Sequence, residues 1–205
     1  MNSRSLFLLI PGLIMALSAL AGCATVDQKI ALNYAPVDRP FGRHDGEIVV
    51  SRVEPPSSVQ NSKGEWIIGS INNVHGVHRA DLLSDRSLGE WITDAMALEL
   101  KHAGYTVTSA PSLPAAVSRG ILITNINVFL DVNKGLASDQ IKHGLTFNVE
   151  VFLNGAKVKT FMVASNDNST LLTASRETKE KIMLQSLQDD MLQIIPDIIA
   201  QIEKK

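Results

Sequence analysis

The chain has a single cysteine, Cys23, and only 5% of its 205 residues are aromatic. One cysteine excludes an intrachain disulfide framework and a cysteine-rich zinc module. There is no basic surplus, because 19 lysines and arginines stand against 21 aspartates and glutamates, and this balance argues against a nucleic-acid-binding protein. With 45% hydrophobic and 20% charged residues the composition is that of a globular chain, and the length favours one domain.

The first 22 residues contain one charged residue, Arg4, and no acid. From Leu6 to Ala21 the side chains are apolar or small, and Pro11-Gly12 interrupts the run. A membrane-spanning helix needs about 20 uninterrupted apolar residues, so this segment is too short to be one. A basic start, an apolar middle and a small-residue end are typical of a cleaved secretory signal peptide, which we predict over residues 1–22.

The apolar run ends in Leu20-Ala21-Gly22-Cys23, which matches the bacterial lipobox of a leucine, two small residues and an obligatory cysteine. Small residues let a peptidase hold the extended backbone close to its catalytic groups, and the cysteine thiol accepts a diacylglyceryl group. We therefore predict that Cys23 becomes the first mature residue and carries lipid, palmitate included. One acyl chain binds a membrane only marginally, whereas two or three chains hold a protein firmly.

Ala24 follows the predicted lipidation site, and an aspartate does not. In enterobacteria-like sorting, an aspartate at this position retains a lipoprotein in the inner membrane. Ala24 therefore predicts the outer membrane of a Gram-negative bacterium, on its periplasmic face, with the inner membrane as the less favoured destination. Residues 23–46, which contain scattered prolines and glycines, are expected to form the lipidated N-terminus and a flexible tether. The alternative is that Ile30–Tyr34 docks on the domain as an edge strand.

Residues 47–205 are expected to form a periplasmic α+β domain. Hydrophobic periodicity predicts strands over 47–53, 66–71, 105–108, 120–132, 145–153 and 156–164, and helices over 86–103 and 175–202. Ser87 and Glu90 have the spacing of a capping box, Gly104 is expected to end the first helix, and Pro196 predicts a kink or a break in the second. This order predicts a single mostly antiparallel sheet with two helices packed on one face.

Two strand registers follow from the local sequence. Asn154-Gly155 predicts a two-residue hairpin, because a type I′ turn needs two residues with positive φ. Pairing outward from this turn places the following residues opposite one another: Leu153 and Ala156, Val151 and Val158, Phe147 and Met162. In the strand over 120–132, the even-numbered residues from Leu122 to Val132 are expected to share one face.

Residues that could carry chemistry are few. The chain has no glycine-rich phosphate loop, no Gly-x-Ser-x-Gly elbow and no His-Glu-x-x-His motif. His75 and His78 are closely spaced, but zinc would need Asp81 or Asp85 as well, and these are more often exposed turn residues. We interpret Asp139 and His143 as loop residues, and we expect Glu99 and His102 to reach out to water. The sequence thus predicts no catalytic residue, no metal site and no cofactor.

Several segments together resemble the YajG-like bacterial lipoproteins over nearly the whole mature chain. They are the lipobox ending at Cys23, Leu32-Asn-Tyr-Ala-Pro36, Ile48-Val-Val-Ser-Arg-Val53, Ile68-Gly-Ser-Ile-Asn-Asn73 with Gly76, and Glu99-Leu-Lys-His-Ala-Gly104. Where family members often have Asp-x-Arg after the first strand, this chain has Val53-Glu-Pro-Pro56. The resemblance implies a lipid-anchored envelope protein and supplies no catalytic residues.

Two functions fit these observations, and neither is enzymatic. The first is an interaction or accessory module in the periplasm, which is attached to the membrane through the lipid on Cys23 and binds an envelope protein partner. The second is a carrier or chaperone that binds a lipid or another apolar ligand in a cavity between the sheet and the helices.

Overall fold

The computed structural model describes residues 26–38, 41–54 and 59–204. The predicted signal peptide, Cys23, Ala24 and Pro55-Pro56 lie outside the described residues. The strands are β1 (Gln28–Lys29), β2 (Glu47–Arg52), β3 (Trp66–Asn72), β4 (His78–Ser84), β5 (Thr106–Ser109), β6 (Arg119–Lys134), β7 (Asp139–Leu153) and β8 (Ala156–Leu171); the helices are α2 (Leu88–His102) and α3 (Arg176–Ile202). Neither helix is long and apolar enough to cross a membrane.

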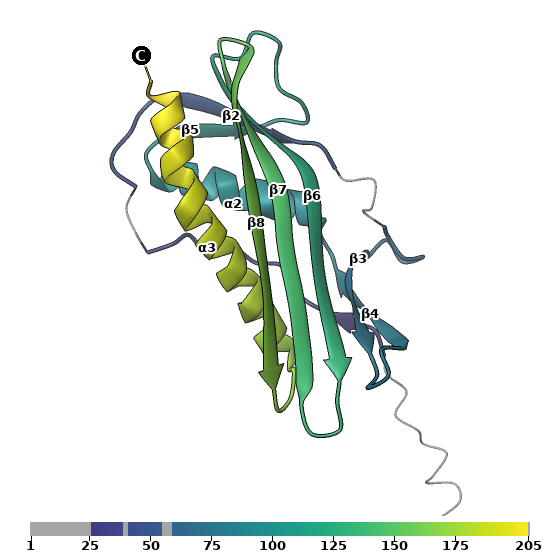
Figure 1. The fold of residues 1–205 in the computed structure, drawn as a ribbon. Coiled ribbons are helices and arrows are strands. Elements are labelled where there is room, and N and C mark those ends of the chain that lie inside the picture. The colour runs from purple at the N-terminus through teal and green to yellow at the C-terminus, as the bar shows by residue number, and fades with distance from the viewer. Residues whose placement is uncertain (1–25, 39–40, 55–58, 205) are drawn as a thin grey trace, which may run out of the picture.

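The strands form one sheet in which β6 is the central element (Figure 1). On one side, β6 pairs with β2 near its start and with β3 near its end; on the other side, it pairs with β7 along its length. Beside β3 the sheet continues with β4 and then β1. Strand β5 lies beside β2, and β8 lies beside β7. The long strands β6, β7 and β8 thus form the body of the sheet, and two shorter groups of strands extend it on the other side.

The sheet is mixed, which corrects the predicted mostly antiparallel arrangement. Among the described strands, four pairings are parallel and three are antiparallel. The predicted strand order also lacked β1 and β4. Parallel pairs such as β2 with β6 need long crossover connections, and local periodicity identifies a strand without identifying its partner.

A β-bulge in β6 changes the predicted face of this strand. Asn125 has a φ of 52°, and the register with β7 shifts by one residue between Thr124 and Asn127. The buried residues are therefore Ile121 and Ile123 before the bulge and Ile126, Leu130 and Val132 after it. One inserted residue exchanges the two faces of a strand, so Leu122 and Thr124 do not share the face of Val132.

The predicted β7–β8 hairpin is confirmed at its turn and wrong in its register. Asn154 and Gly155 have φ values of 52° and 78°, and Leu153 pairs with Ala156. A further bulge at Val158 then moves the pairing by one residue, so that Val151 pairs with Lys159 and Phe147 with Val163. The turn chemistry is local, whereas the bulge is set by how the twisted strands pack on the rest of the sheet.

The two helices cover one face of the sheet, as predicted. Helix α2 packs against β2, β5 and β6, α3 packs against β7 and β8, and the helices contact each other (Figure 1). The side chains of Trp91 and Leu187, one from each helix, and of Phe147 from β7 are completely buried between these layers. Their burial makes one hydrophobic core the main source of stability.

The predicted helix ends are largely confirmed. The Ser87 hydroxyl caps α2 by accepting a hydrogen bond of 3.0 Å from the Glu90 amide, and Gly104 follows the helix with a φ of 106°. The break expected at Pro196 is absent, because α3 continues to Ile202. Ile198 and Ile202, beyond the proline, are buried, and this packing offsets the hydrogen bond that proline cannot donate.

Residues 26–38 pack on the domain, so the predicted flexible tether does not apply to them. Ile30 and Leu32 are buried, and the Ile30 amide donates a hydrogen bond of 2.8 Å to the Leu83 carbonyl. The Trp91 indole of α2 donates to the Asn33 carbonyl at 3.2 Å. The alternative of a docked segment is therefore confirmed, but the edge strand is Gln28–Lys29 beside β4, and Ile30–Tyr34 lies outside the strand and packs against the core and α2.

Candidate functional site

A polar cleft of about 470 Å³ lies between the β7–β8 edge of the sheet and α3. Six of the residues that line it are His143 of β7, Ser165 and Asp167 of β8, and Ser186, Asp190 and Gln193 of α3. We call it the β8–α3 cleft. Elsewhere α3 packs on the sheet through the apolar side chains of the core. The polar side chains of the β8–α3 cleft are therefore the part of this helix–sheet interface that hydrophobic burial does not explain.

Strand alternation brings these side chains to the helix-facing side of the sheet. Val163 of β8 is buried opposite Phe147, and two and four residues later Ser165 and Asp167 face the same way. Asp167 pairs directly with His143 of β7 in the register of the two strands. The inward face of β8 thus changes from apolar to polar halfway along the strand, and the cleft opens where it does.

Asp190 is the most perturbed acid of the cleft. The residue is only 4% exposed. Its carboxylate accepts a hydrogen bond of 3.0 Å from the Ser165 hydroxyl. Burial raises the pKa of Asp190 to about 6, the Ser165 hydrogen bond opposes the rise, and the neighbouring Asp189 charge adds to it. Asp190 therefore exchanges a proton in the weakly acidic range and both accepts and donates hydrogen bonds there.

His143 is the second buried ionisable group of the cleft. The residue is 5% exposed, and its Nδ1 atom has no hydrogen-bond partner among the described residues. Burial lowers the pKa of His143, and the charge of Asp167 opposes this shift. The sequence interpretation of Asp139 and His143 as loop residues is wrong, because both lie in β7 and both are buried.

Ser165 is engaged by the side chains of α3 rather than by His143. Ser165 donates its hydroxyl hydrogen to Asp190, and its oxygen lies 3.3 Å from the Ser186 hydroxyl. A serine nucleophile needs a base such as histidine within hydrogen-bond reach. In register, Ser165 lies opposite Leu145 and Asp167 lies opposite His143, so the serine and the histidine are diagonal neighbours, and His143 Nδ1 makes no hydrogen bond among the described residues.

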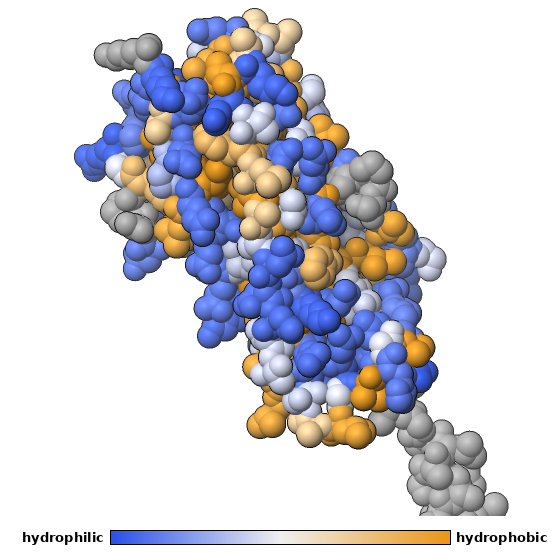
Figure 2. All heavy atoms as spheres, viewed as in Figure 1, coloured by the Kyte–Doolittle hydropathy of each residue, from blue (hydrophilic) through white to orange (hydrophobic). Residues whose placement is uncertain are grey.

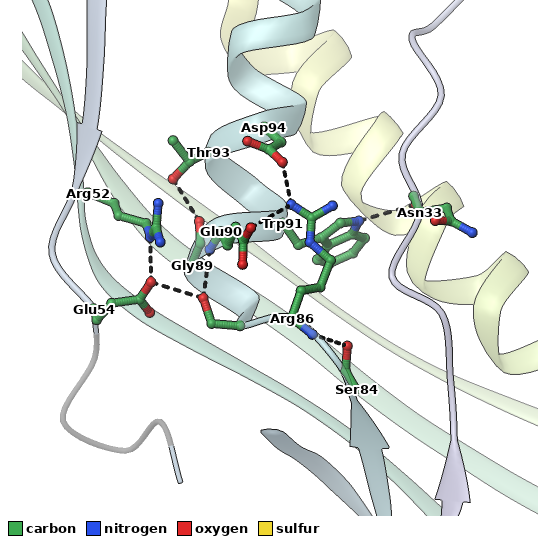
Figure 3. A network of polar contacts seen from close by, with 11 residues as sticks. Asn33, Arg52, Glu54, Ser84, Arg86, Gly89, Glu90, Trp91, Thr93 and Asp94 are labelled. Carbon is green, nitrogen blue, oxygen red and sulfur yellow. Dashed lines mark hydrogen bonds and ion pairs between the residues drawn. The ribbon is translucent and has the colours of Figure 1, made fainter. Parts of the chain in front are cut away.

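A second polar network surrounds the start of α2 (Figure 3). Glu54, just after β2, accepts a hydrogen bond of 2.9 Å from the Ser87 hydroxyl and pairs with Arg52. On the other side of the helix, Arg86 pairs with Asp94. A cleft of about 460 Å³ lies beside this network, lined by Arg52, Glu54, Thr93, Ser109, Ala110 and Pro111.

This network has a structural role in positioning α2. Ser87 both caps the helix and holds Glu54, so the end of β2 and the start of α2 are fixed to each other. The Thr93 hydroxyl donates to the Gly89 carbonyl at 2.7 Å within the helix. Glu54 and Ser87 are thus engaged in holding α2 and β2 together, and Thr93 is engaged within α2, so we assign the candidate site to the β8–α3 cleft and not to this network.

The residues considered as metal ligands do not form a cluster. His78 Nε2 lies 3.2 Å from Asp81 Oδ1, and His75 is an exposed residue of the β3–β4 turn. Within residues 26–38, 41–54 and 59–204, no three His, Cys, Asp or Glu side chains are grouped as a metal ion would require. Glu99, expected to reach water, is instead fully buried, which corrects that prediction.

Sequence reasoning overlooked Asp190, although the sequence carried a signal for it. Asp190 follows Leu187 by three residues and precedes Ile194 by four, which places it on the apolar stripe of the helix. A carboxylate on a buried stripe needs a partner, and Ser165 provides one. The partner lies 25 residues away in another element, so only the structure identifies it.

No protein-family model matches the chain, and no curated protein matches it. Among solved structures, a Xanthomonas campestris protein of the DUF330 family is similar with a TM-score of 0.52 and 9% identity, over 85% of this chain and 96% of that one. A neuraminyllactose-binding hemagglutinin homolog from Helicobacter pylori has a TM-score of 0.46 and 11% identity, over 84% and 97%. Rare lipoprotein B from Shewanella oneidensis has a TM-score of 0.36 and 11% identity, over 66% and 98%. The first likeness shows the fold alone, and the other two are too distant to bear on it.

Proposed function

We propose that this chain is a YajG-like lipoprotein, anchored through acylated Cys23 to the periplasmic face of a Gram-negative outer membrane, and that it acts there as a non-enzymatic interaction module. The anchor follows from the lipobox Leu20-Ala21-Gly22-Cys23. The module is the α+β domain that begins within a few residues of this cysteine. An envelope protein is the partner that such an anchor brings within reach.

The observation that carries the proposed function is the open edge of β8 beside the β8–α3 cleft. Strand β8 has 16 residues, and β7 is its only partner strand among the described residues. An unpaired strand edge presents a row of backbone donors and acceptors that an extended segment of another chain can pair with. The adjacent cleft supplies Ser, Asp and Gln side chains that would select a polar segment.

The filled core favours this function over a carrier of apolar ligands. A carrier would need an apolar cavity between the sheet and the helices. There, the side chains of Trp91, Met96, Phe147 and Met191 are completely buried among one another. The β8–α3 cleft is lined mainly by polar side chains, so its surface suits a polar partner better than a lipid chain.

The anchor is tested by replacing the lipidation site. Cys23→Ser should abolish incorporation of labelled palmitate and leave an unprocessed precursor, whereas a serine variant of a surface residue, Lys101→Ser, should be labelled like the wild type. Palmitate retained on the Cys23 variant would contradict the assignment of the lipobox.

The interaction surface is tested by photo-crosslinking in intact cells. A photoreactive amino acid replaces Asp167 or Gln185 in the cleft, and a matched exposed position, Lys101 of α2, is the control. We expect both cleft positions to crosslink to the same envelope protein and the control to give no such product. Equal crosslinking at all three positions, or none in the cleft, would show that this surface does not bind a partner.

A further inference from the structure

One end of the sheet collects three chain reversals. The β3–β4 turn follows Asn72, the β6–β7 turn follows Lys134, and the chain leaves β8 after Leu171. Because Asn72 pairs with Asn133 and Asp139 pairs with Leu171, the three reversals lie at the same end of the sheet, which is the lower end in Figure 1.

Large apolar side chains project from these reversals into solvent. Leu136 and Leu172 are 98% and 87% exposed, which makes them the two most exposed large hydrophobic residues of the described chain. Val74 and Val77 of the β3–β4 turn are also more than half exposed. We call these four residues the apolar tip, and Figure 2 shows apolar residues at this end of the molecule.

The turns that carry the apolar tip are formed by internal hydrogen bonds. In the β3–β4 turn the Asn73 amide donates to the Val77 carbonyl at 2.9 Å, and the Asn73 side chain accepts from the His75 and Val77 amides. In the β6–β7 turn the Gly135 amide donates to the Ser138 carbonyl at 3.0 Å. These backbone groups are already paired, which lowers the cost of moving the turns into a less polar medium.

The N-terminal segment enters the domain at this same end. Strand β1 runs parallel to β4, with Gln28 opposite Leu82, so Val26 is level with the first residues of β4. The Asp27 carboxylate accepts a hydrogen bond of 2.9 Å from the Asp81 amide, and the buried Lys179 of α3 donates to the Gln28 side chain at 2.9 Å. The point at which the chain joins the sheet is therefore fixed relative to the apolar tip.

The short connection to Cys23 sets how far a membrane can lie from the tip. Two residues, Ala24 and Thr25, lie between Cys23 and Val26, so the three Cα–Cα steps that join them span at most about 11 Å. The strand registers place Val26 level with Ala80 of β4 and, across β3, with Val132 of β6. Leu136 follows Val132 by four residues, so it lies at most about 13 Å nearer the end of the molecule. A lipid on Cys23 and the apolar tip thus reach about the same level.

We propose that the apolar tip inserts into the headgroup layer of the phospholipid bilayer in which the acyl chains of Cys23 are anchored. This inference rests on the proposed lipidation. The charge of the three reversals agrees with it: residues 73–79, 135–138 and 172–175 contain no acid and include Arg79, whereas bacterial membranes carry anionic phospholipids that repel carboxylates. The nearest acid in sequence is Asp139, which directly follows Ser138, is 5% exposed and pairs with Lys134 at 2.6 Å.

Insertion of the tip would orient the whole domain. A lipid anchor alone leaves a domain free to rotate, whereas an anchor with several inserted apolar contacts fixes one end against the membrane. Strand β7 has 15 residues and extends about 50 Å from this end, so the β7–β8 hairpin would point away from the membrane. The open edge of β8 would then stand upright in the periplasm, where a partner can reach it.

Depth-dependent fluorescence quenching tests the inserted tip. The full chain, acylated in cells, is placed in vesicles of phosphatidylethanolamine and phosphatidylglycerol after a polarity-sensitive dye is attached at Leu136→Cys or Leu172→Cys. Acylated Cys23 has no free thiol, so it does not take the dye. Val158→Cys, near the opposite end and also exposed, is the matched control.

We expect a blue shift and loss of fluorescence with lipid-borne quenchers at both tip positions, and no quenching by lipid at the control. Leu136→Asp should weaken the quenching at Leu172→Cys, because a carboxylate is excluded from the headgroup layer.

Vesicle-bound protein whose tip dyes respond only to aqueous iodide would overturn the inserted tip while leaving the anchor intact. Protection from both quenchers would show that protein covers the tip, which also overturns it. Protein without acyl mass that fails to float with vesicles would overturn the anchor and the inference together.

Discussion

The Tyr34 hydroxyl donates a hydrogen bond to the carboxylate of Glu99, a residue with no exposed surface. The same carboxylate oxygen accepts a second hydrogen bond of 2.8 Å from the Val37 amide. Burial, and then the Glu99 carboxylate, raise the pKa of Tyr34 above its ordinary value, so Tyr34 remains a hydrogen-bond donor. This pair joins the N-terminal segment to α2 and thereby fixes the segment that carries the predicted lipid.

Tyr34→Phe should therefore lower the free energy of unfolding by about 1–3 kcal/mol, because it removes a donor from a buried carboxylate. Tyr105→Phe is the matched control. The Tyr105 hydroxyl donates to Glu203, whose side chain is 41% exposed, so water replaces the lost donor and the cost is smaller. Urea unfolding of both variants measures the difference, and equal losses would show that Glu99 is not held through Tyr34.

The β7–β8 turn should be more sensitive to a side chain than another glycine with the same φ. Gly155 and Gly64 both have a φ of 78°, but a Cβ on Gly155 would lie 2.4 Å from the Ala115 carbonyl oxygen, whereas a Cβ on Gly64 meets nothing within 4 Å. Gly64→Ala should cost about 1–2 kcal/mol from backbone strain alone. Gly155→Ala should cost more in the same chemical melt, and equal costs would contradict the close approach of residue 115.

Asp190 should make stability depend on pH between about 4 and 6. Its pKa rises from 3.8 to about 6 on folding, so the folded state holds the proton more tightly than the unfolded state. The stabilisation is complete below pH 3.8 and is lost as the pH rises through about 6. Wild type loses this stabilisation between pH 4 and pH 7 and Asp190→Asn does not. The free energy of unfolding of the variant should therefore rise by on the order of 2 kcal/mol relative to that of wild type over this range.

Unfolding measured at several pH values tests this dependence. Asp189→Asn, at the exposed neighbouring position, is the comparison and should reduce the slope only slightly, because the Asp189 charge makes the smallest contribution to the raised pKa. His143, whose pKa burial lowers, and Asp167 also face the cleft, so the comparison is made between variants and wild type at each pH. Parallel pH profiles for wild type and Asp190→Asn would contradict the raised pKa.

Leu187 of α3 belongs to the core and not to a docking surface. The residue is completely buried, so Leu187→Ala should lower the free energy of unfolding by roughly 2–5 kcal/mol. Leu184, partly exposed on the same helix, should lose less when changed to Ala. A Leu187 variant that melts like wild type but loses an envelope partner would reverse the assignment.

Ala24→Asp should move the protein towards the inner membrane in a host that sorts lipoproteins by this residue. Fractionation of the two membranes on a density gradient measures the shift, and Ala24→Ser serves as a control that preserves a small uncharged side chain. An unchanged distribution of the aspartate variant would count against sorting to the outer membrane by Ala24.

The sequence by itself determined the features that depend on neighbouring residues. The lipobox at Cys23, the Ser87 cap and the Asn154-Gly155 turn are short motifs, and the structure confirms the cap and the turn. The two helices were predicted to within a few residues because their apolar stripes repeat over several turns. The lipobox lies outside the described residues and stays a prediction.

Only the tertiary structure decided the features that join distant parts of the chain. The mixed sheet follows from β6 pairing with both β2 and β3, and the bulge at Asn125 reverses a face that strict alternation predicts. The Ser165–Asp190 pair and the position of the apolar tip depend on the same long-range pairings. Periodicity records which side of an element is apolar, whereas the choice of partner depends on contacts that no local window contains.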